Sequence, residues 1–141
     1  MKVTLNRIND DYRLEAKGSR DTPVYIDHKA SEDAEVDGVS PMELLLMSVG
    51  GCNAIDIIYV LKKQRQIVTS YHVEVEGERT EVRNAKPFKA IHVKVFLEGE
   101  ILPAKALRAA KLSFENYCSV SITLENSVKI TYEVILNGTK L

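Results

Sequence analysis

One apolar segment, from Ser40 to Arg65, dominates the pattern of hydrophobic and polar residues and predicts a long helix. Ser40 and Glu43 have the spacing of a capping box, and Pro41 suits the first helical position. Leucine, isoleucine, valine and methionine side chains then cover nearly the whole circumference of the helix. A helix that is apolar on every side is a buried one, so the segment predicts a long buried central helix.

A membrane span of this length is the alternative, and polar residues argue against it. Glu43, Asn53 and Asp56 lie inside the segment. Such groups are rare in a single membrane-spanning helix. We therefore expect a core helix and no membrane.

Two adjacent glycines, Gly50 and Gly51, interrupt this helix just before Cys52. A glycine in a helix interior costs about 1 kcal/mol relative to alanine. The pair allows either another backbone to pack closely or a molecule to reach the thiol of Cys52. The sequence leaves these two explanations open.

Short segments with alternating or β-branched residues predict strands on both sides of the helix. They fall within residues 3–8, 12–16, 24–26, 71–75, 91–97, 121–124 and 128–136. Pro103 opens a second helix that ends at Cys118. The predicted order is β-β-β-α-β-β-α-β-β, an α+β fold in a single domain over residues 1–141. The predicted strands are too few to bury every side of this apolar helix. We therefore expect a partner subunit to cover the rest of it.

Composition narrows the classes of function. With 19 Lys and Arg against 20 Asp and Glu, the net charge of −1 argues against a protein dedicated to nucleic acids or anionic membranes. The first residues contain no apolar leader, so a cytoplasmic location is expected. The two cysteines, Cys52 and Cys118, form no C-x-x-C motif and are expected to be reduced thiols or a redox couple.

Other catalytic chemistry is poorly represented. The three histidines, His28, His72 and His92, share no metal-ligand spacing. The chain contains no nucleophile-elbow motif, no phosphate-binding glycine loop and no dinucleotide-binding motif. We expect no metal and no organic cofactor, and the two thiols remain as the candidate chemistry.

The segments SPMELLLMSVGGC and ENYCSVSITLE together resemble the OsmC/Ohr superfamily of thiol-dependent peroxidases. The shared features are a Pro-led apolar helix, a cysteine eleven residues after that proline, and a second cysteine after the second helix. The resemblance implies an intertwined homodimer that reduces organic hydroperoxides in defence against oxidative stress. It also implies a dithiol reductant, in the Ohr branch a lipoylated protein.

The resemblance assigns roles to three residues of this chain. Cys52 would be the peroxidatic cysteine and Cys118 the resolving one. Attack on an O–O bond requires thiolate, and a cysteine in mid-helix gains nothing from the helix N-terminus. A guanidinium must therefore come from elsewhere, and Arg20, in a Gly-x-Arg-Asp context like that of the Ohr branch, is the candidate. An ordinary solvated turn would equally explain Arg20, with Arg7 or Arg13 as substitutes.

The chain departs from the Ohr pattern at Met42, where Ohr proteins have a glutamate. Glu43 follows one residue later, and one residue turns a helix by about 100°. Glu43 is thus a candidate catalytic residue that a capping role also explains. The departure keeps an alternative open, a non-catalytic dimer of the same fold that senses oxidants or binds a small apolar ligand.

The distance along the helix predicts a site shared between two chains. Nine residues separate Glu43 from Cys52, a rise of about 13–14 Å. An arginine near the start of the helix would face the same gap. We therefore expect the cysteines of one chain to meet the arginine of the other.

Overall fold

The computed structural model describes residues 1–141, which form two compact units, Met1–Leu45 and Leu46–Leu141. The boundary falls within the first turns of the long helix, α1 (Pro41–Lys63).

The first unit contains a three-stranded antiparallel sheet in the order β1-β2-β3. Its strands are β1 (Thr4–Arg7), β2 (Leu14–Lys17) and β3 (Val24–Ile26). The carboxamide oxygen of Asn9 accepts hydrogen bonds from the backbone N–H groups of Asp11 and Arg13, at 3.1 and 3.0 Å, and so shapes the turn from β1 to β2. The three strands predicted before the helix are confirmed.

The predicted capping box opens α1. The backbone N–H of Glu43 donates to Ser40 Oγ at 3.2 Å, and the backbone N–H of Ser40 donates to Glu43 Oε2 at 2.8 Å. The helix ends near Arg65, which adopts a left-handed conformation with φ of 57°.

The second unit is built on a four-stranded sheet in the order β4-β5-β6-β7. The strands are β4 (Ile67–Arg79), β5 (Phe88–Glu100), β6 (Lys129–Leu136) and β7 (Thr139–Lys140). Strands β4 and β5 form the predicted antiparallel hairpin, whereas β6 pairs with β5 in parallel. A parallel neighbour requires a crossover. Here it consists of α2 (Pro103–Leu112), a π-helical turn η1 (Ser113–Tyr117) and α3 (Ser119–Leu124).

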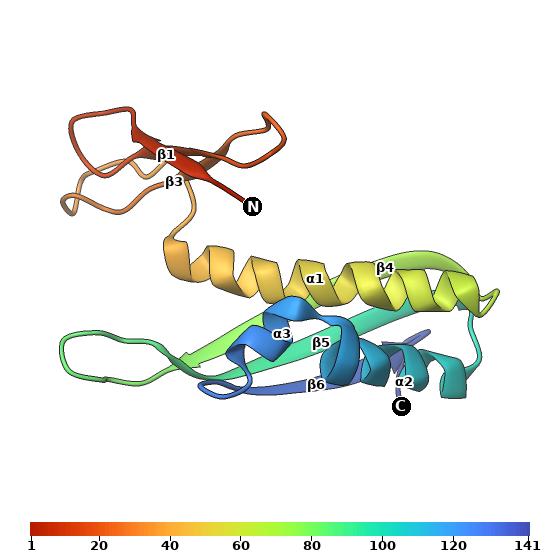
Figure 1. The fold of residues 1–141 in the computed structure, drawn as a ribbon. Helices are drawn as coiled ribbons and strands as arrows, with labels where there is room; N and C mark the ends of the chain where they lie inside the picture. Colours follow the sequence, from red (N-terminus) through yellow and green to blue (C-terminus); the bar gives the residue numbers. More distant parts are fainter. The chain divides into compact units, whose positions relative to one another are not determined.

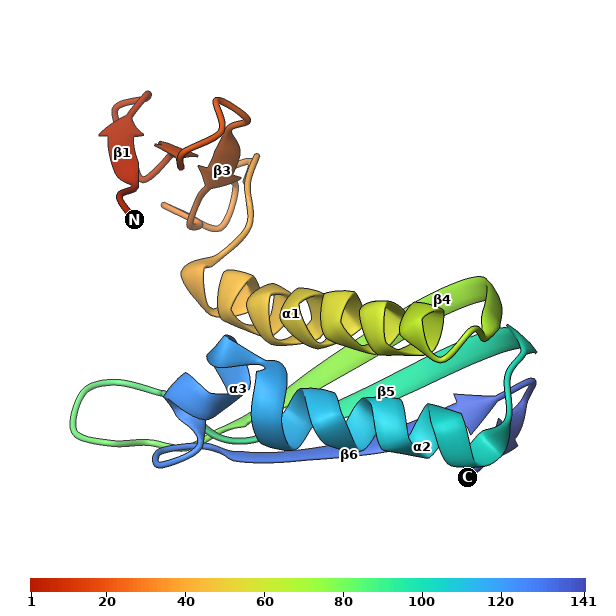
Figure 2. The ribbon, with the colours of Figure 1, turned by 45° about the vertical axis from the view of Figure 1, so that its right-hand side comes forward.

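The helices of the second unit cover one face of this sheet (Figure 1, Figure 2). Ile91, Val93, Val95 and Leu97 of β5 are at most 1% exposed on that face. The same core takes side chains from the helices: Val49, Ile57 and Leu61 of α1 and Ala106, Ala109 and Ala110 of α2. The intervening residues of β4 and β5, such as His92, are more exposed, as the alternating pattern predicted.

Gly77 of β4 shows how tightly this sheet is packed. A Cβ placed there would lie 2.3 Å from Cε1 of Phe88 and 3.0 Å from Cδ2 of Leu46. The ring of Phe88 therefore occupies the space that a side chain at residue 77 would need.

One element was predicted wrongly. Residues 121–124 belong to helix α3, not to a strand, and the last two strands are β6 and the short β7. Val120, Ile122 and Thr123 are β-branched and favour a strand. Local hydrogen bonds outweigh that preference, since Cys118 caps the helix and Thr123 Oγ1 donates to the Ser119 carbonyl at 2.7 Å.

Helix α1 is buried on one side only within a single chain. It is long and apolar enough to cross a membrane, by length and composition, and a third of its most apolar window is buried. An exposed stripe runs along its other side at four-residue spacing, through Met47, Gly51, Ile55 and Tyr59. The sequence predicted a helix buried on every side, but the side chains of this stripe are exposed in the single chain.

Candidate thiol site

The second unit brings the two cysteines together. Cys52 on α1 is half-buried, Cys118 before α3 is fully buried, and both are free thiols. Their sulfur atoms and one carboxylate oxygen of Asp56 all lie within 4.8 Å of one another. The two cysteines are 66 positions apart in the sequence, and the residue pattern alone did not predict that they would meet. Only the family resemblance implied this proximity.

The π-helical turn places Cys118. The backbone N–H of Cys118 donates to the Ser113 carbonyl at 2.9 Å, and Cys118 then takes an extended conformation. Its sulfur accepts a hydrogen bond from the backbone N–H of Ser121 at 3.3 Å, as the N-cap of α3. Single π-helical turns are frequent at functional sites.

A buried polar network joins α1 to this crossover. Asn53, which is 0% exposed, donates from Nδ2 to the Val49 carbonyl at 2.8 Å and to Ser121 Oγ at 3.1 Å. Ser113 Oγ donates to Asn53 Oδ1 at 2.8 Å. Because Ser113 and Ser121 flank Cys118 in sequence, the network fixes Cys118 against the helix that carries Cys52.

The surroundings of Cys52 within this unit disfavour its thiolate. Burial is the main cause that raises the pKa of Cys52, and the neighbouring Cys118 and the carboxylate of Asp56 raise it further. A backbone hydrogen bond from Val120 acts in the opposite direction. A positive charge near Cys52 would have to come from outside these groups.

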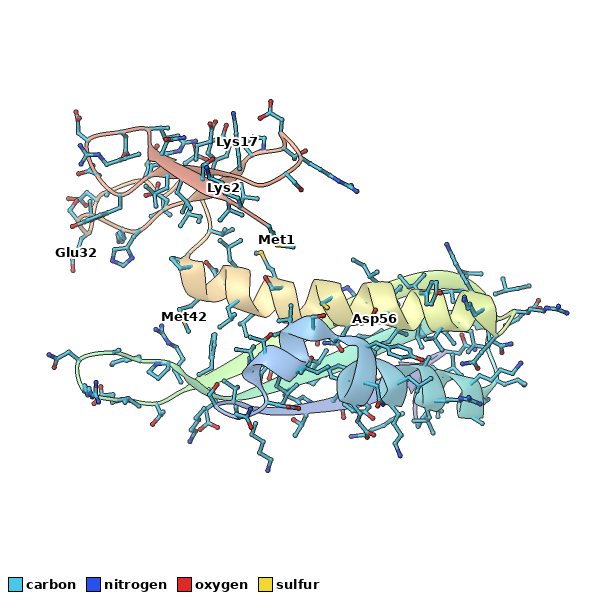
Figure 3. The ribbon with its side chains drawn as sticks, in the orientation of Figure 1. Met1, Lys2, Lys17, Glu32, Met42 and Asp56 are labelled. Atoms are coloured by element: carbon cyan, nitrogen blue, oxygen red, sulfur yellow. The ribbon has the colours of Figure 1, made fainter.

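Asp56 is a member of the site that sequence reasoning missed. It lies four residues after Cys52 on α1, so both side chains are on the same face of the helix. Figure 3 labels Asp56 on this helix. Its Oδ2 is buried and has no hydrogen-bond partner. Burial raises the pKa of Asp56, while the Ser113 side chain lowers it. The available signal was an acidic residue in an apolar helix at i+4 from a cysteine.

A pocket of about 580 Å³ adjoins this cluster. Its walls come from α1, α2 and η1: Asp56, Tyr59, Val60, Lys63, Gln64, Arg108, Leu112 and Tyr117. Asp56 thus faces both the thiols and an opening that contains two cationic side chains.

The two glycines before Cys52 have different surroundings. A Cβ at Gly50 would lie 2.9 Å from Cγ2 of Val75, so Gly50 permits close packing of α1 on β4. A Cβ at Gly51 would meet nothing within 4 Å. Close packing therefore explains Gly50, and open space remains at Gly51.

Arg20 and Glu43 lie in the first unit, so neither belongs to the unit that holds the thiols. Arg20 is exposed in the turn between β2 and β3, where its neighbour Asp21 pairs with Lys17 at 3.7 Å. Glu43 is occupied by the capping box, and its hydrogen bonds with Ser40 lower its pKa. The catalytic roles of both residues stay predictions.

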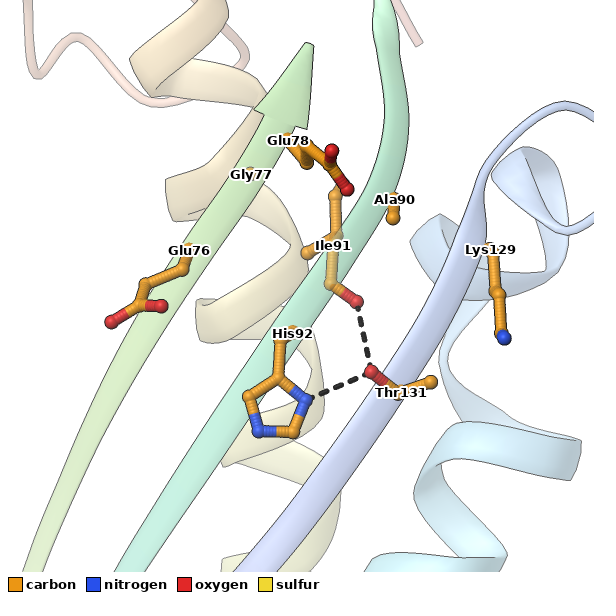
Figure 4. A pocket seen from close by; sticks show the side chains of 8 residues that line it. All are labelled: Glu76, Gly77, Glu78, Ala90, Ile91, His92, Lys129 and Thr131. Carbon is orange, nitrogen blue, oxygen red and sulfur yellow. Dashed lines mark hydrogen bonds between the residues drawn. The ribbon is translucent and has the colours of Figure 1, made fainter.

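Of the three histidines, His28 lies in the first unit, and His72 and His92 lie on the polar face of the sheet in the second unit. His92 lies on the polar face of the sheet, in a pocket of about 410 Å³, where its Nδ1 is 2.8 Å from Thr131 Oγ1 (Figure 4). Helix α1 packs on the opposite face. His72 pairs with Glu74 at 3.6 Å on the exposed side of β4.

Comparison with known proteins shows which family this chain resembles. A family model described as OsmC-like protein matches residues 32–133. Protein YhfA of Escherichia coli (strain K12) is 42% identical over 99 residues, which cover 68% of this chain and 73% of that protein. A crystal structure of a hypothetical protein from Aquifex aeolicus is 31% identical and covers 96% of both chains with a TM-score of 0.81.

One more distant structural neighbour has a name that describes a function. An organic hydroperoxide resistance protein OsmC from Legionella pneumophila has the same fold, with a TM-score of 0.66 over 95% of this chain and 96% of that one. At 14% identity, this likeness concerns the fold alone.

Proposed function

Since the chain belongs to the OsmC-like family, we propose that it is a thiol-dependent hydroperoxide reductase that protects against oxidative stress. The observation that carries the proposal is the proximity of the Cys52 and Cys118 sulfurs, within 4.8 Å in one chain. Two free thiols at that distance can form a disulfide after a modest side-chain movement.

The reaction follows from the exposure of the two thiols. Cys52 is the more accessible one, so its thiolate attacks the O–O bond and becomes a sulfenic acid, while the alkoxide that leaves takes a proton from solvent to give the alcohol. The buried Cys118 thiol then displaces the sulfenic oxygen as water and forms the Cys52–Cys118 disulfide. An external dithiol, for which a lipoylated protein is our candidate, reduces this disulfide and is itself oxidised.

The thiolate of Cys52 needs a positive charge, because its neighbours raise its pKa. We assign this charge to Arg20 of the partner subunit in a homodimer. Arg20 has no ion-pair partner of its own chain to compete for it. Glu43 remains a candidate to orient that guanidinium.

The exposed stripe on α1 supports the dimer. Met47, Ile55 and Tyr59 are 54%, 71% and 54% exposed, which is unusual for large apolar side chains along one ridge. Gly51 in the same ridge has space for a second helix to approach. Covering α1 in this way makes it the central helix of an intertwined dimer, and a cytoplasmic location would keep its thiols reduced.

The test is consumption of cumene hydroperoxide by the reduced protein with dihydrolipoamide as the reductant. The wild-type chain should turn over, and one equivalent of peroxide without reductant should lower the intact mass by about 2 Da, since a disulfide loses two hydrogens. The Cys52→Ser variant should be inactive. The Cys118→Ser variant should react once and then be driven to the sulfinic acid by excess peroxide.

The Ser119→Ala variant is the matched control, because it changes an exposed neighbour of Cys118 and should keep full turnover. Oxidation of Cys118 before Cys52 would reverse the assigned roles. If the disulfide forms but dihydrolipoamide does not reduce it, the protein is an oxidant sensor and not a reductase.

A further inference from the structure

Asp56 is a half-buried acidic group that the proposed peroxide chemistry does not use. Its Oδ2 has no hydrogen-bond partner, and a buried carboxylate oxygen left unpaired is costly. A protein usually satisfies such a group with a donor or a cation. Both thiols lie within 4.8 Å of the Asp56 carboxylate.

We propose that Cys52, Asp56 and Cys118 of the reduced chain bind one thiophilic divalent cation, Zn²⁺, with three protein ligands and an open fourth position. The inference rests on the two thiols being reduced, and not on the proposed peroxidase activity.

The distances fit such a site. With Zn–S bonds of about 2.3 Å and Zn–O bonds of about 2.1 Å, tetrahedral ligand atoms lie roughly 3.6–3.8 Å apart. The three ligand atoms are already within 4.8 Å of one another, so closure by about 1 Å is enough. Rotation of side chains supplies that movement, because Cys52 and Asp56 are four residues apart on the same helix.

The choice of ion follows from the ligands. Two thiolates and one carboxylate suit a borderline-soft ion, whereas Mg²⁺ and Ca²⁺ need more oxygen ligands than Asp56 offers. A coordinated thiol is deprotonated outright, which removes the obstacle that burial and Asp56 present to the thiolate.

The surroundings provide what a metal site needs beyond its ligands. Backbone N–H groups support both sulfurs, from Ser121 to Cys118 and from Val120 to Cys52. The 580 Å³ pocket that Asp56 lines gives solvent access for an ion and for a fourth ligand. Lys63 and Arg108 line the same pocket and offset the net negative charge of two thiolates, one carboxylate and Zn²⁺.

The site and the disulfide exclude each other. Oxidation takes two electrons from the two thiolates and, with two protons from solvent, reduces one hydroperoxide to an alcohol and water, leaving no thiolate for the ion. Zn²⁺ would then be released from the oxidised chain.

Cobalt is the probe for this site, because Co²⁺ bound tetrahedrally by thiolates absorbs strongly in both the ultraviolet and the visible. The full-length chain, reduced with a phosphine under argon, should show these bands with saturation at one Co²⁺ per chain, and Zn²⁺ should abolish them. The oxidised wild-type chain should show none, which tests both sulfurs without any substitution.

One isosteric variant tests Asp56 as the third ligand, and a second isosteric variant is its control. The Asp56→Asn variant should bind Co²⁺ at least tenfold more weakly, since even the loss of an outer-shell partner costs about 10–100-fold. The Glu115→Gln variant changes an exposed acidic residue of the neighbouring turn and should bind like the wild type.

Absence of the cobalt bands in the reduced wild type, or equal affinity of the Asp56→Asn variant, would overturn the inference. The peroxide assay, run with a chelator, separates the two proposals. Turnover without cobalt binding would overturn only the metal site, and cobalt binding without turnover would overturn only the reductase.

Discussion

Ser40 and Glu43 hold the first turn of α1 through two reciprocal hydrogen bonds, and these bonds lower the pKa of Glu43. A carboxyl group whose pKa is lower in the folded state stabilises the fold above its unfolded pKa. That stabilisation is lost as the pH falls through the lower, folded pKa. The charge of Glu43 should therefore contribute stability at neutral pH and none in strong acid.

The Glu43→Gln variant keeps the capping geometry and removes the charge. It should unfold more easily than the wild type at pH 7, and the difference should shrink steadily below the ordinary glutamate pKa of about 4.3. Urea unfolding between pH 7 and pH 3 measures this. The Glu32→Gln variant, in the exposed acidic loop, is the control and should show no such trend. A pH-independent difference for Glu43→Gln would contradict the assignment.

The sequence alone predicted the role of some site residues and not of others. The capping box could be predicted from Ser40 and Glu43 alone, because both partners lie within four residues. The meeting of Cys52 and Cys118 depends on a crossover between two strands, so only resemblance to a family pointed to it. Asp56 could be read only as a charge in an apolar helix, since its role depends on a thiol that another element supplies.

At the scale of the elements, alternation predicted the hairpin of β4 and β5 correctly, because one face of the sheet is covered and the other is not. Helix α3 could not be predicted in this way. It is six residues long and rich in β-branched side chains, and contacts distant in sequence hold it. Asn53 of α1, for example, bonds to Ser121 within it.

Gly77 gives a test of packing at this scale. Alanine is ordinarily the better strand residue, but a Cβ at residue 77 would lie 2.3 Å from the Phe88 ring. The Gly77→Ala variant should therefore lose about 1–3 kcal/mol of unfolding free energy, as overpacked cores do. Equilibrium urea unfolding checks this value.

A second substitution identifies the cause. Phe88→Leu, added to Gly77→Ala, should make room for the new methyl group, so the two effects should be non-additive. The Gly18→Ala variant is the matched control, because its nearest contact would be Val3 at an ordinary 4.0 Å. Additive effects at residues 77 and 88 would show that the ring is not the obstacle.

For the whole molecule, the proposed dimer places each pair of cysteines in one chain and Arg20 in the other. Chains with Cys52→Ser and chains with Arg20→Ala should each be inactive in hydroperoxide turnover. When they are refolded together, a mixed dimer should contain one complete site and regain measurable activity. Size-exclusion chromatography of differently tagged chains confirms that mixed dimers have formed.

A matched pair controls for refolding itself. Cys52→Ser mixed with Cys118→Ser should remain without turnover, because the two sulfurs of a site come from the same chain. Activity in this control would place the cysteines of one site on different chains. Active mixed dimers are not expected if Arg20 acts within its own chain.

The parallel pairing of β5 with β6 has a consequence for how the chain acquires its thiol chemistry. The hairpin of β4 and β5 is local and can form early, whereas β6 must wait until the whole crossover has been closed. Cys118 lies in that crossover and reaches Cys52 only when the crossover docks on α1. We therefore expect the two sulfurs to meet late in folding, so rapid formation of the Cys52–Cys118 disulfide should require the completed tertiary structure.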